Sequence, residues 1–133
     1  SYPIGISKLE AEPIVRDPFD VDENNGLVFN AAIPQESFVD ILTGDTDSLI
    51  LAAGKAYQES IKSFNGETQD AVFVVDCISR VLFLEDEFER EIGVMRESAS
   101  KLIGILSIGE IANSGRDYLE LYNKTCVVGV LGD

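Results

Sequence analysis

The sequence predicts an α+β fold in which two main helices pack on one face of a largely antiparallel, mixed β-sheet. Short apolar segments with a period of two dominate the first third of the chain. Two longer segments with helical periodicity follow, one on each side of a continuous apolar run. With 133 residues, the chain has the length of a single domain, residues 1–133, that can bury a core of its own.

The first third of the chain is predicted to form strands. Residues 2–6 are short and apolar, and apolar and charged residues alternate around Phe19 before the turn sequence Asn24-Asn25-Gly26. Asparagine and glycine tolerate a positive φ angle, so this tripeptide is typical of a β-hairpin turn. We expect the returning strand within residues 27–33 and a further short strand over residues 38–42.

The first helix is predicted to begin near Asp45. The sequence Asp45-Thr46-Asp47 offers a side chain that can cap the first turn, and its acidic charge is favourable at the positive end of a helix. Apolar residues then recur at steps of three and four, which places them on one helix face. They are Ile50, Ala53, Tyr57, Ile61 and Phe64.

A continuous apolar run and a second helix follow. Residues 71–77 are apolar up to their last two positions, which indicates a central strand that is buried on both faces. The second helix is expected within residues 79–96, where the apolar stripe consists of Leu84, Phe88, Ile92 and Met95. The opposite, solvated face is expected to carry Glu85, Asp86, Glu87, Glu89 and Glu91.

The last third of the chain returns to strands. Residues 102–108 are almost entirely apolar and predict another buried strand. Residues 119–131 predict a long final strand that is bent or bulged near Asn123 and Gly129.

The charge and composition exclude several classes of function. The chain has 24 acidic and 10 basic residues, a formal net charge of −14, so it lacks the basic surface that nucleic acid or an anionic membrane requires. It contains no histidine, which removes Ser-His and Cys-His pairs and histidine ligands for metals or haem. We therefore expect no metal site and no cofactor. Cys77 and Cys126 are expected to be reduced and unpaired.

Two charged side chains follow the apolar strands of the second half. Arg80 comes three residues after the run 71–77, and Glu110 comes after the run 102–108, directly behind Gly109. A carboxylate without a partner is costly to bury, so two interpretations are open. Either Arg80 and Glu110 form a salt bridge that closes the strand ends, or both side chains point into a pocket.

Three segments of this region resemble a known family. They are Cys77-Ile78-Ser79-Arg80, the stretch 103–111 with Gly109-Glu110-Ile111, and Asn123-Lys124-Thr125. Their order and spacing are similar to the C-terminal domain of FIST proteins (F-box and intracellular signal transduction). The pattern of that family is a strand ending in Cys-x-x-Arg, a strand ending in Gly-Glu-Ile, and then His-Asn-x-Thr. The resemblance covers nearly the whole chain, but Tyr122 stands where the family often has histidine.

The resemblance implies a small-ligand-binding sensory domain of an intracellular, bacterial signal-transduction protein that senses ligands such as amino acids. It also implies a longer protein, with an N-terminal FIST domain and a downstream signalling module as partners in the same chain. The absence of histidine speaks against the haem-based sensing of some FIST proteins. The ligand-binding residues that the resemblance implies are Cys77, Ser79, Arg80, Gly109, Glu110, Tyr122, Asn123 and Thr125.

In this interpretation, Arg80 binds a ligand carboxylate with its planar pair of donors and Glu110 takes an ammonium group. Asn123 and Thr125 orient the ligand through hydrogen bonds. We expect a cytoplasmic protein that is not an enzyme. Two alternatives stay open. One is a non-catalytic interaction or scaffold domain that docks a partner signalling module. The other is an enzyme with Cys77 as nucleophile and Glu110 or Asp76 as base.

Overall fold

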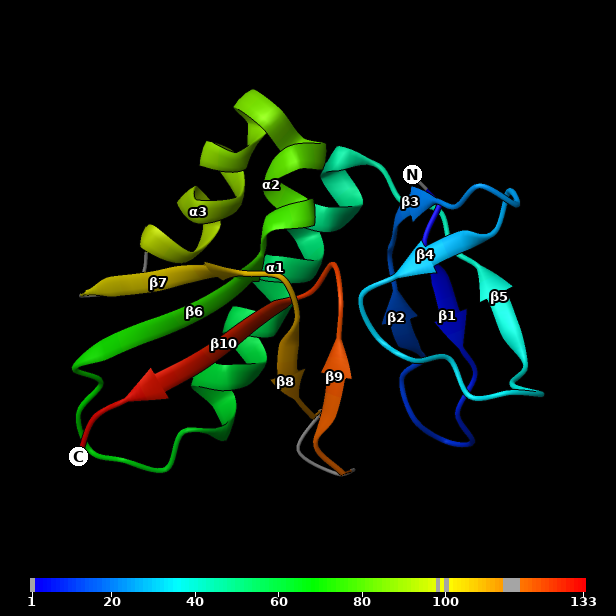
Figure 1. Ribbon diagram of the computed structural model, residues 1–133. Helices are drawn as coiled ribbons and strands as arrows, with labels where there is room; N and C mark the ends of the chain where they lie inside the picture. Colours follow the sequence, from blue (N-terminus) through cyan, green and yellow to red (C-terminus); the bar gives the residue numbers. More distant parts are fainter. Residues whose placement is uncertain (1, 98, 100, 114–117) are drawn as a thin grey trace.

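The protein has a helix-covered sheet at one end and a group of small antiparallel sheets at the other, as Figure 1 shows. The computed structural model drawn there describes residues 2–97, 99, 101–113 and 118–133. The α+β class predicted from the sequence is confirmed. The strands of the described residues, however, form four separate sheets instead of one, because most strands outside the main sheet have only three or four residues and pair only with their near neighbours.

The main sheet has three strands in the order β10-β6-β7. The central strand β6 (Ala71–Cys77) pairs in parallel with β7 (Leu102–Ser107) and antiparallel with β10 (Cys126–Leu131). A parallel pair needs a crossover connection, and the helical segment between β6 and β7 provides it. The sheet is therefore mixed, as the sequence predicts.

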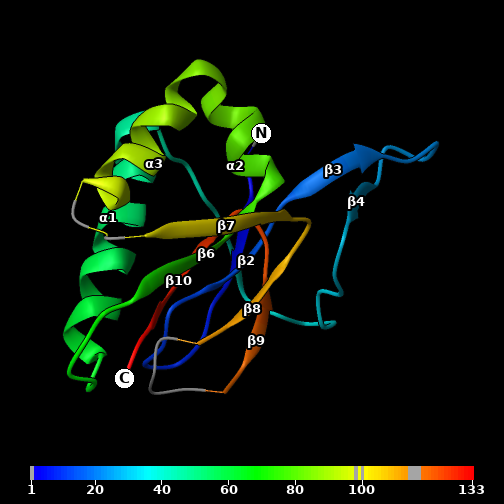
Figure 2. The ribbon, with the colours of Figure 1, turned by 90° about the vertical axis from the view of Figure 1, so that its left-hand side faces the viewer.

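All helices lie on one face of this sheet (Figures 1 and 2). Asp45 is the N-cap residue of helix α1 (Thr46–Ser63). Its side chain accepts a hydrogen bond from the backbone N–H of Ser48, and the Ser48 hydroxyl accepts one from the N–H of Asp45. The second predicted helix is broken into α2 (Ile78–Leu84), a 3₁₀ turn η1 (Glu85–Glu87) and α3 (Phe88–Arg96). The break coincides with a positive φ angle of 50° at Glu85.

The core lies between the helices and the sheet. Its buried members are Tyr57 of α1, Val72 and Val74 of β6, and Met95 of α3, which is fully buried. Burial of these side chains is the main favourable term that holds α1 and α3 on the sheet. The residues that alternate with them in β6, Phe73 and Val75, are only half-buried. The sequence predicts that this strand is buried on both faces, and this prediction is wrong. The helices cover one face only.

The sequence predicts a buried strand over residues 102–108. The predicted strand is present, but the prediction that it is buried is wrong. The strand β7 exists, but it lies at the edge of the sheet, and Ile103, Ile105 and Leu106 are 58%, 55% and 51% exposed. An apolar sequence shows that a strand prefers burial, but it does not show where the strand lies in the order of the sheet. Within the described part of the chain, no strand pairs with the outer edge of β7.

The small sheets are antiparallel. Strands β1 (Ile4–Ile6), β2 (Ile14–Arg16) and β5 (Val39–Ile41) form one sheet in the order β2-β1-β5. Strands β3 (Pro18–Val21) and β4 (Leu27–Phe29) form a projecting hairpin (Figure 2). Its turn is the predicted one, because Asn25 has a φ of 62° and the Asp22 carboxylate accepts from the N–H groups of Asn24 and Gly26.

The predicted final strand over residues 119–131 is interrupted at Asn123. Strand β9 (Glu120–Tyr122) pairs with β8 (Glu110–Ala112), and β10 then turns onto the main sheet. The N–H of Asn123 donates to the carbonyl of Val15 in β2, which ties the N-terminal sheet to this corner. The interruption brings the start of β10 together with the ends of β6 and β7 and the start of β8.

Neighbouring residues of α1 provide a test of the helix orientation. Ile50 is 7% exposed and Leu51 is 74% exposed. We expect Ile50→Ala to lower the free energy of unfolding by about 2–5 kcal/mol, because it leaves a cavity in the core. The matched variant Leu51→Ala should change it by less than about 0.5 kcal/mol. Urea denaturation measures both, and equal losses would contradict this orientation of α1.

Candidate functional site

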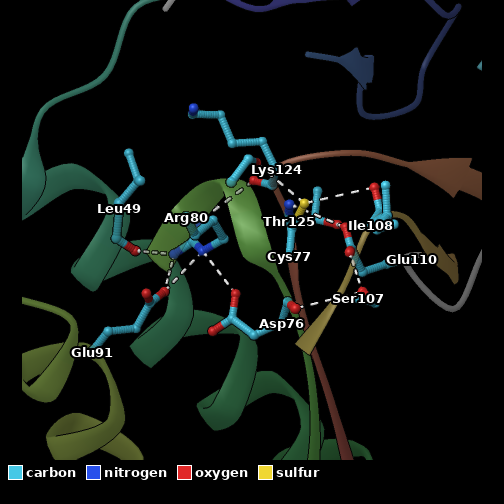
Figure 3. Close-up of polar contacts among 11 residues, drawn as sticks. Leu49, Asp76, Cys77, Arg80, Glu91, Ser107, Ile108, Glu110, Lys124 and Thr125 are labelled. Atoms are coloured by element: carbon cyan, nitrogen blue, oxygen red, sulfur yellow. Dashed lines mark hydrogen bonds and ion pairs between the residues drawn. The ribbon is translucent and has the colours of Figure 1, made fainter. Parts of the chain in front are cut away.

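The eight residues that the resemblance singles out do not form one cluster. Figure 3 shows Arg80 on the helix side of the sheet end, while Glu110 lies on the far side of Cys77. Arg80 and Glu110 are both buried, at 4% and 1% exposed. Each has its own set of protein partners, and these two sets are described in turn.

Glu110 stands at the centre of the first set. Its carboxylate accepts from the hydroxyl of Ser107, from the hydroxyl of Thr125 at 2.7 Å, and from the backbone N–H of Thr125 at 3.3 Å. These donors come from the end of β7 and the turn before β10, so Glu110 connects three strand ends. These donors satisfy the buried carboxylate inside the protein.

Five further predicted residues lie at this end of the main sheet. The Asn123 side-chain amide donates to the carbonyl of Ile108 at 3.1 Å, and the Cys77 thiol lies 3.2 Å from the hydroxyl of Ser79. A Cβ atom on Gly109 would lie 3.2 Å from the Asn123 amide nitrogen, so glycine leaves room for this side chain. Tyr122 is half-buried in β9 and pairs with Glu110 across the hairpin. Glycine here serves close packing inside the protein.

Arg80 stands at the centre of the second set, in which its main partners are charged side chains. Its guanidinium donates to the Glu91 carboxylate through both Nε and Nη2, and Nε lies 3.3 Å from Asp76 Oδ1. It also donates to the backbone carbonyls of Leu49, at 2.9 Å, and Lys124, at 3.5 Å. Of the two interpretations that the sequence left open, the Arg80–Glu110 salt bridge is therefore wrong. Arg80 pairs instead with the carboxylates on the helix side.

The carboxylate that pairs with Arg80 was expected in solvent. The acidic residues around Glu91 in the sequence predict a solvated position for it. In the structure, its side chain is 0% exposed. Leu84, Phe88, Glu91 and Met95 are spaced by four, three and four residues, so Glu91 occupies the core-facing stripe of α3. A charged residue at such a position indicates a buried ion pair, because an unpaired charge there is costly.

Asp76 is the least satisfied group of the cluster. It is 2% exposed, and neither of its carboxylate oxygens accepts a hydrogen bond from a described residue. The Nε–H of Arg80 is near but is directed at Glu91. Oε2 of Glu91 also lacks a donor among the described residues. Buried polar groups nearly always have partners, so these free oxygens require an explanation.

The charge balance explains the behaviour of Asp76. Two buried carboxylates, Asp76 and Glu91, face one guanidinium, that of Arg80. Burial and the neighbouring Glu91 charge raise the pKa of Asp76 to about 7, although Arg80 opposes this shift. Burial also raises the pKa of Glu91, again against the effect of Arg80. Near neutral pH the cluster therefore holds a proton for part of the time.

Cys126 of β10 completes the cluster on the side of the sheet. Both cysteines are free, as the sequence predicts, and burial strongly raises the pKa of the Cys126 thiol. Asp76, Glu91 and Cys126 offer ligand atoms within 4.8 Å of one another. A metal ion there would lie beside the Arg80 guanidinium and would require a thiolate that this environment disfavours. The donor set is a poor fit for a divalent ion.

A cavity of about 280 Å³ reaches Asp76 from the side of α3 and β7. Its walls are mainly apolar and include Phe88, Ile92, Leu102 and Leu106, while Arg96 provides a second charge. Neither Arg80 nor Glu110 lines it. A second hollow of about 370 Å³ beside α1 is lined by Tyr57, Gln58, Ile61, Lys62 and Gln69 and does not reach the charged cluster.

The sequence itself contains signals for the charged cluster around Arg80 that do not depend on the family resemblance. Asp76 interrupts an otherwise apolar strand, and it lies four residues before Arg80, a spacing that allows an ion pair at the start of a helix. Glu91 occupies a core-facing position of a periodic stripe. Arg96 has no distinguishing pattern, because its contribution depends on how α3 packs beside β7.

The FIST C domain family matches residues 1–113 of this chain. The chain belongs to the FIST C domain family. The matched region includes Cys77, Arg80 and Glu110, and it ends before Tyr122, Asn123 and Thr125. FIST C domains are associated with signal transduction. The comparisons found no curated protein and no solved structure that matches this FIST C domain. Among the described residues, no helix has the length and apolar character needed to cross a membrane.

Removal of Arg80 tests the buried cluster. Arg80→Met leaves two carboxylates without their counter-charge, so we expect a loss of about 3–5 kcal/mol in the free energy of unfolding at pH 7. The loss should shrink at pH 5, because without Arg80 the buried carboxylates take up protons more readily. The control Arg90→Met removes an exposed pair with Asp47 and Glu87 and should cost less than about 1 kcal/mol. Urea denaturation compares them, and equal effects would contradict a structural role for Arg80.

The raised pKa of Asp76 predicts a dependence of stability on pH. The folded-state pKa of about 7 lies above the ordinary value of 3.8, so the folded protein binds this proton more tightly than the unfolded chain. The free energy of unfolding should therefore fall as pH rises from 4 to 7. Asp76→Asn should remove this part of the slope, whereas Asp47→Asn on the exposed start of α1 should keep it. Urea denaturation between pH 4.5 and 8 measures both slopes, and identical slopes would show that Asp76 does not titrate in this range.

Proposed function

We propose that this FIST C domain is the sensory domain of a cytoplasmic signal-transduction protein and that it binds a small ligand, with amino acids among the candidates. The observation that carries the proposal is the cavity between α3 and β7, whose lining includes the buried Asp76 with two carboxylate oxygens that accept no hydrogen bond from a described residue. Ligand sites are typically concave and mostly apolar, with a few polar groups that fix orientation. The two charged lining residues, Asp76 and Arg96, suit the two ends of a zwitterion.

Ligand binding in this cavity offers a route for a signal to leave the domain. The cavity lies between α3 and the edge strand β7, and α3 carries Glu91, the main partner of Arg80. A ligand that prefers one packing of α3 on the sheet shifts the protein toward that packing. Arg80 also donates to carbonyl groups of α1 and of the turn before β10. A shift of α3 that moves Arg80 would therefore alter the contacts of these two elements as well.

In this proposal, the residues identified by the resemblance support the site. Arg80 and Glu110 have protein partners for their charges, and their direct contact with ligand stays a prediction. We also propose that the domain is not an enzyme. The Cys77 thiol faces the Ser79 hydroxyl and, at 3.9 Å, the carbonyl of Ile108. Neither group is a base that could activate it.

A second candidate function is an interaction or scaffold domain that docks a partner signalling module. The observation that favours it is the exposed apolar edge strand β7, where Ile103 and Ile105 are more than half exposed. Exposed edge strands are sites at which another chain can add a strand. Such a domain would need no ligand in the cavity, so ligand binding separates the two candidates.

A ligand panel with a cavity-blocking variant tests the proposal. The twenty amino acids and a set of simple amines, acids and alcohols are screened by thermal unfolding and confirmed by calorimetry. A true ligand at 100 times its Kd should add about 2.7 kcal/mol to the free energy of unfolding. Leu106→Trp fills the cavity from its half-exposed wall and should abolish this gain. The control Leu82→Trp makes the same change on an exposed face of α2 and should keep it.

The outcomes separate the two candidate functions. A compound that stabilises the parent and Leu82→Trp but not Leu106→Trp supports the sensory function. A compound that stabilises all three proteins equally shows that the ligand site lies outside this cavity. If no compound of the panel binds, the sensory proposal fails and the interaction domain becomes the better account.

A further inference from the structure

We propose that the cavity between α3 and β7 binds a small organic ammonium ion and that the Asp76 carboxylate is the anion that pairs with it. This inference rests on the proposed function, because it names the ligand class of the same cavity. It starts from the free oxygens of Asp76, which is 2% exposed and lines the cavity. Its nearest cation, Arg80, is shared with the Glu91 carboxylate, so a second cation or a proton is needed to balance the buried charge of Asp76.

The charge balance of the buried cluster favours a positive group at the end of the ligand that lies beside Asp76. Asp76 and Glu91 supply two negative charges, and Arg80 supplies one positive charge. Glu91 receives two N–H donors of Arg80, so the uncompensated charge resides mainly on Asp76. One monovalent cation makes the buried cluster neutral, whereas a divalent ion would leave an excess positive charge beside the guanidinium.

The walls of the cavity favour an organic cation over a bare inorganic ion. Phe88, Ile92, Leu102 and Leu106 line the approach to Asp76 and offer no oxygen ligands. Na⁺ and K⁺ need several oxygen atoms to replace their hydration shells, as hard cations do in general. An ammonium group needs only a few acceptors, and the two buried carboxylate oxygens of Asp76 accept no hydrogen bond from a described residue. Its alkyl body would be buried against the apolar walls.

Ammonium and proton compete for the same carboxylate. The titratable and charged groups that face Asp76 are Arg80 of α2, Glu91 of α3, Cys126 of β10 and, more remotely, Glu110 of β8. Arg96 of α3 shares the cavity, and α1 contributes the Leu49 carbonyl to Arg80. Arg80 is the only cation among those that shift the pKa of Asp76, which lies at about 7. Binding below this pH therefore expels one proton, and binding above it expels none.

The experiment compares three probes of equal size, n-pentylamine, 1-pentanol and pentanoate, by calorimetry on the 133-residue chain between pH 5 and 9. The amine stays charged over this range, so changes in its affinity report on the protein. We expect it to bind at least tenfold more tightly than the alcohol or the acid at pH 8. Its Kd should be roughly 100-fold weaker at pH 5 than at pH 8, because two pH units separate pH 5 from the pKa of Asp76.

Variants assign the effect to Asp76. Asp76→Asn keeps the shape of the side chain and removes its charge, so the amine should bind at least tenfold more weakly and with a flat pH profile. Asp47→Asn makes the same change at an exposed site outside the cavity and should leave both properties unchanged. If Asp76→Asn does not fold, the wild-type comparison of the three probes and the count of released protons in buffers of different ionisation enthalpy still decide the question.

The possible failures are distinct. If the alcohol or the acid binds as well as the amine and Leu106→Trp blocks it, the cavity is a ligand site and the ammonium class is wrong. If potassium chloride stabilises the protein as much as pentylammonium chloride at equal ionic strength, the site takes inorganic cations and the inference fails. If the amine binds with the same affinity at pH 5 and pH 8, Asp76 is not its partner. If neither these probes nor the wider panel bind, the proposed function fails as well.

Discussion

The buried guanidinium of Arg80 is the interaction on which the arrangement of this domain depends. It connects the carbonyl of Leu49 in α1, the carboxylate of Glu91 in α3, Asp76 at the end of β6 and the carbonyl of Lys124 before β10. Arginine suits this role because its donors are held in a rigid plane and its charge is permanent. Since the two carboxylates, Asp76 and Glu91, are buried, the removal of Arg80 would leave both charges without a counter-charge.

A second polar network ends the sheet on the opposite side of Cys77. Glu110 joins Ser107 and Thr125, and Asn123 joins Ile108, so the ends of β7 and β9 and the start of β10 are held in one geometry. The two networks differ in their balance. The donors around Glu110 match its acceptors, whereas the Arg80 cluster has one carboxylate too many. That excess, located where a cavity meets the core, makes the Arg80 cluster the better candidate for ligand chemistry.

The sequence predicted features that depend on neighbours along the chain. The cap at Asp45, the helical stripe that starts at Ile50 and the turn around Asn25 appear as expected, because each depends on local backbone geometry and short-range hydrogen bonds. The free state of Cys77 and Cys126 and the mixed α+β class also follow the prediction. The motifs at Cys77, Arg80 and Glu110 identified residues that are indeed buried and bonded, but not their partners.

The sequence by itself determined the family, the α+β class and the residues that interrupt the apolar strands. Only the tertiary structure decided that Arg80 pairs with Glu91, that β7 lies at an exposed edge and that a cavity ends at Asp76. The physical reason is the range of the interactions. Periodicity and capping act over a few residues, whereas the partner of a buried charge and the neighbour of a strand depend on segments that meet only when the chain has folded.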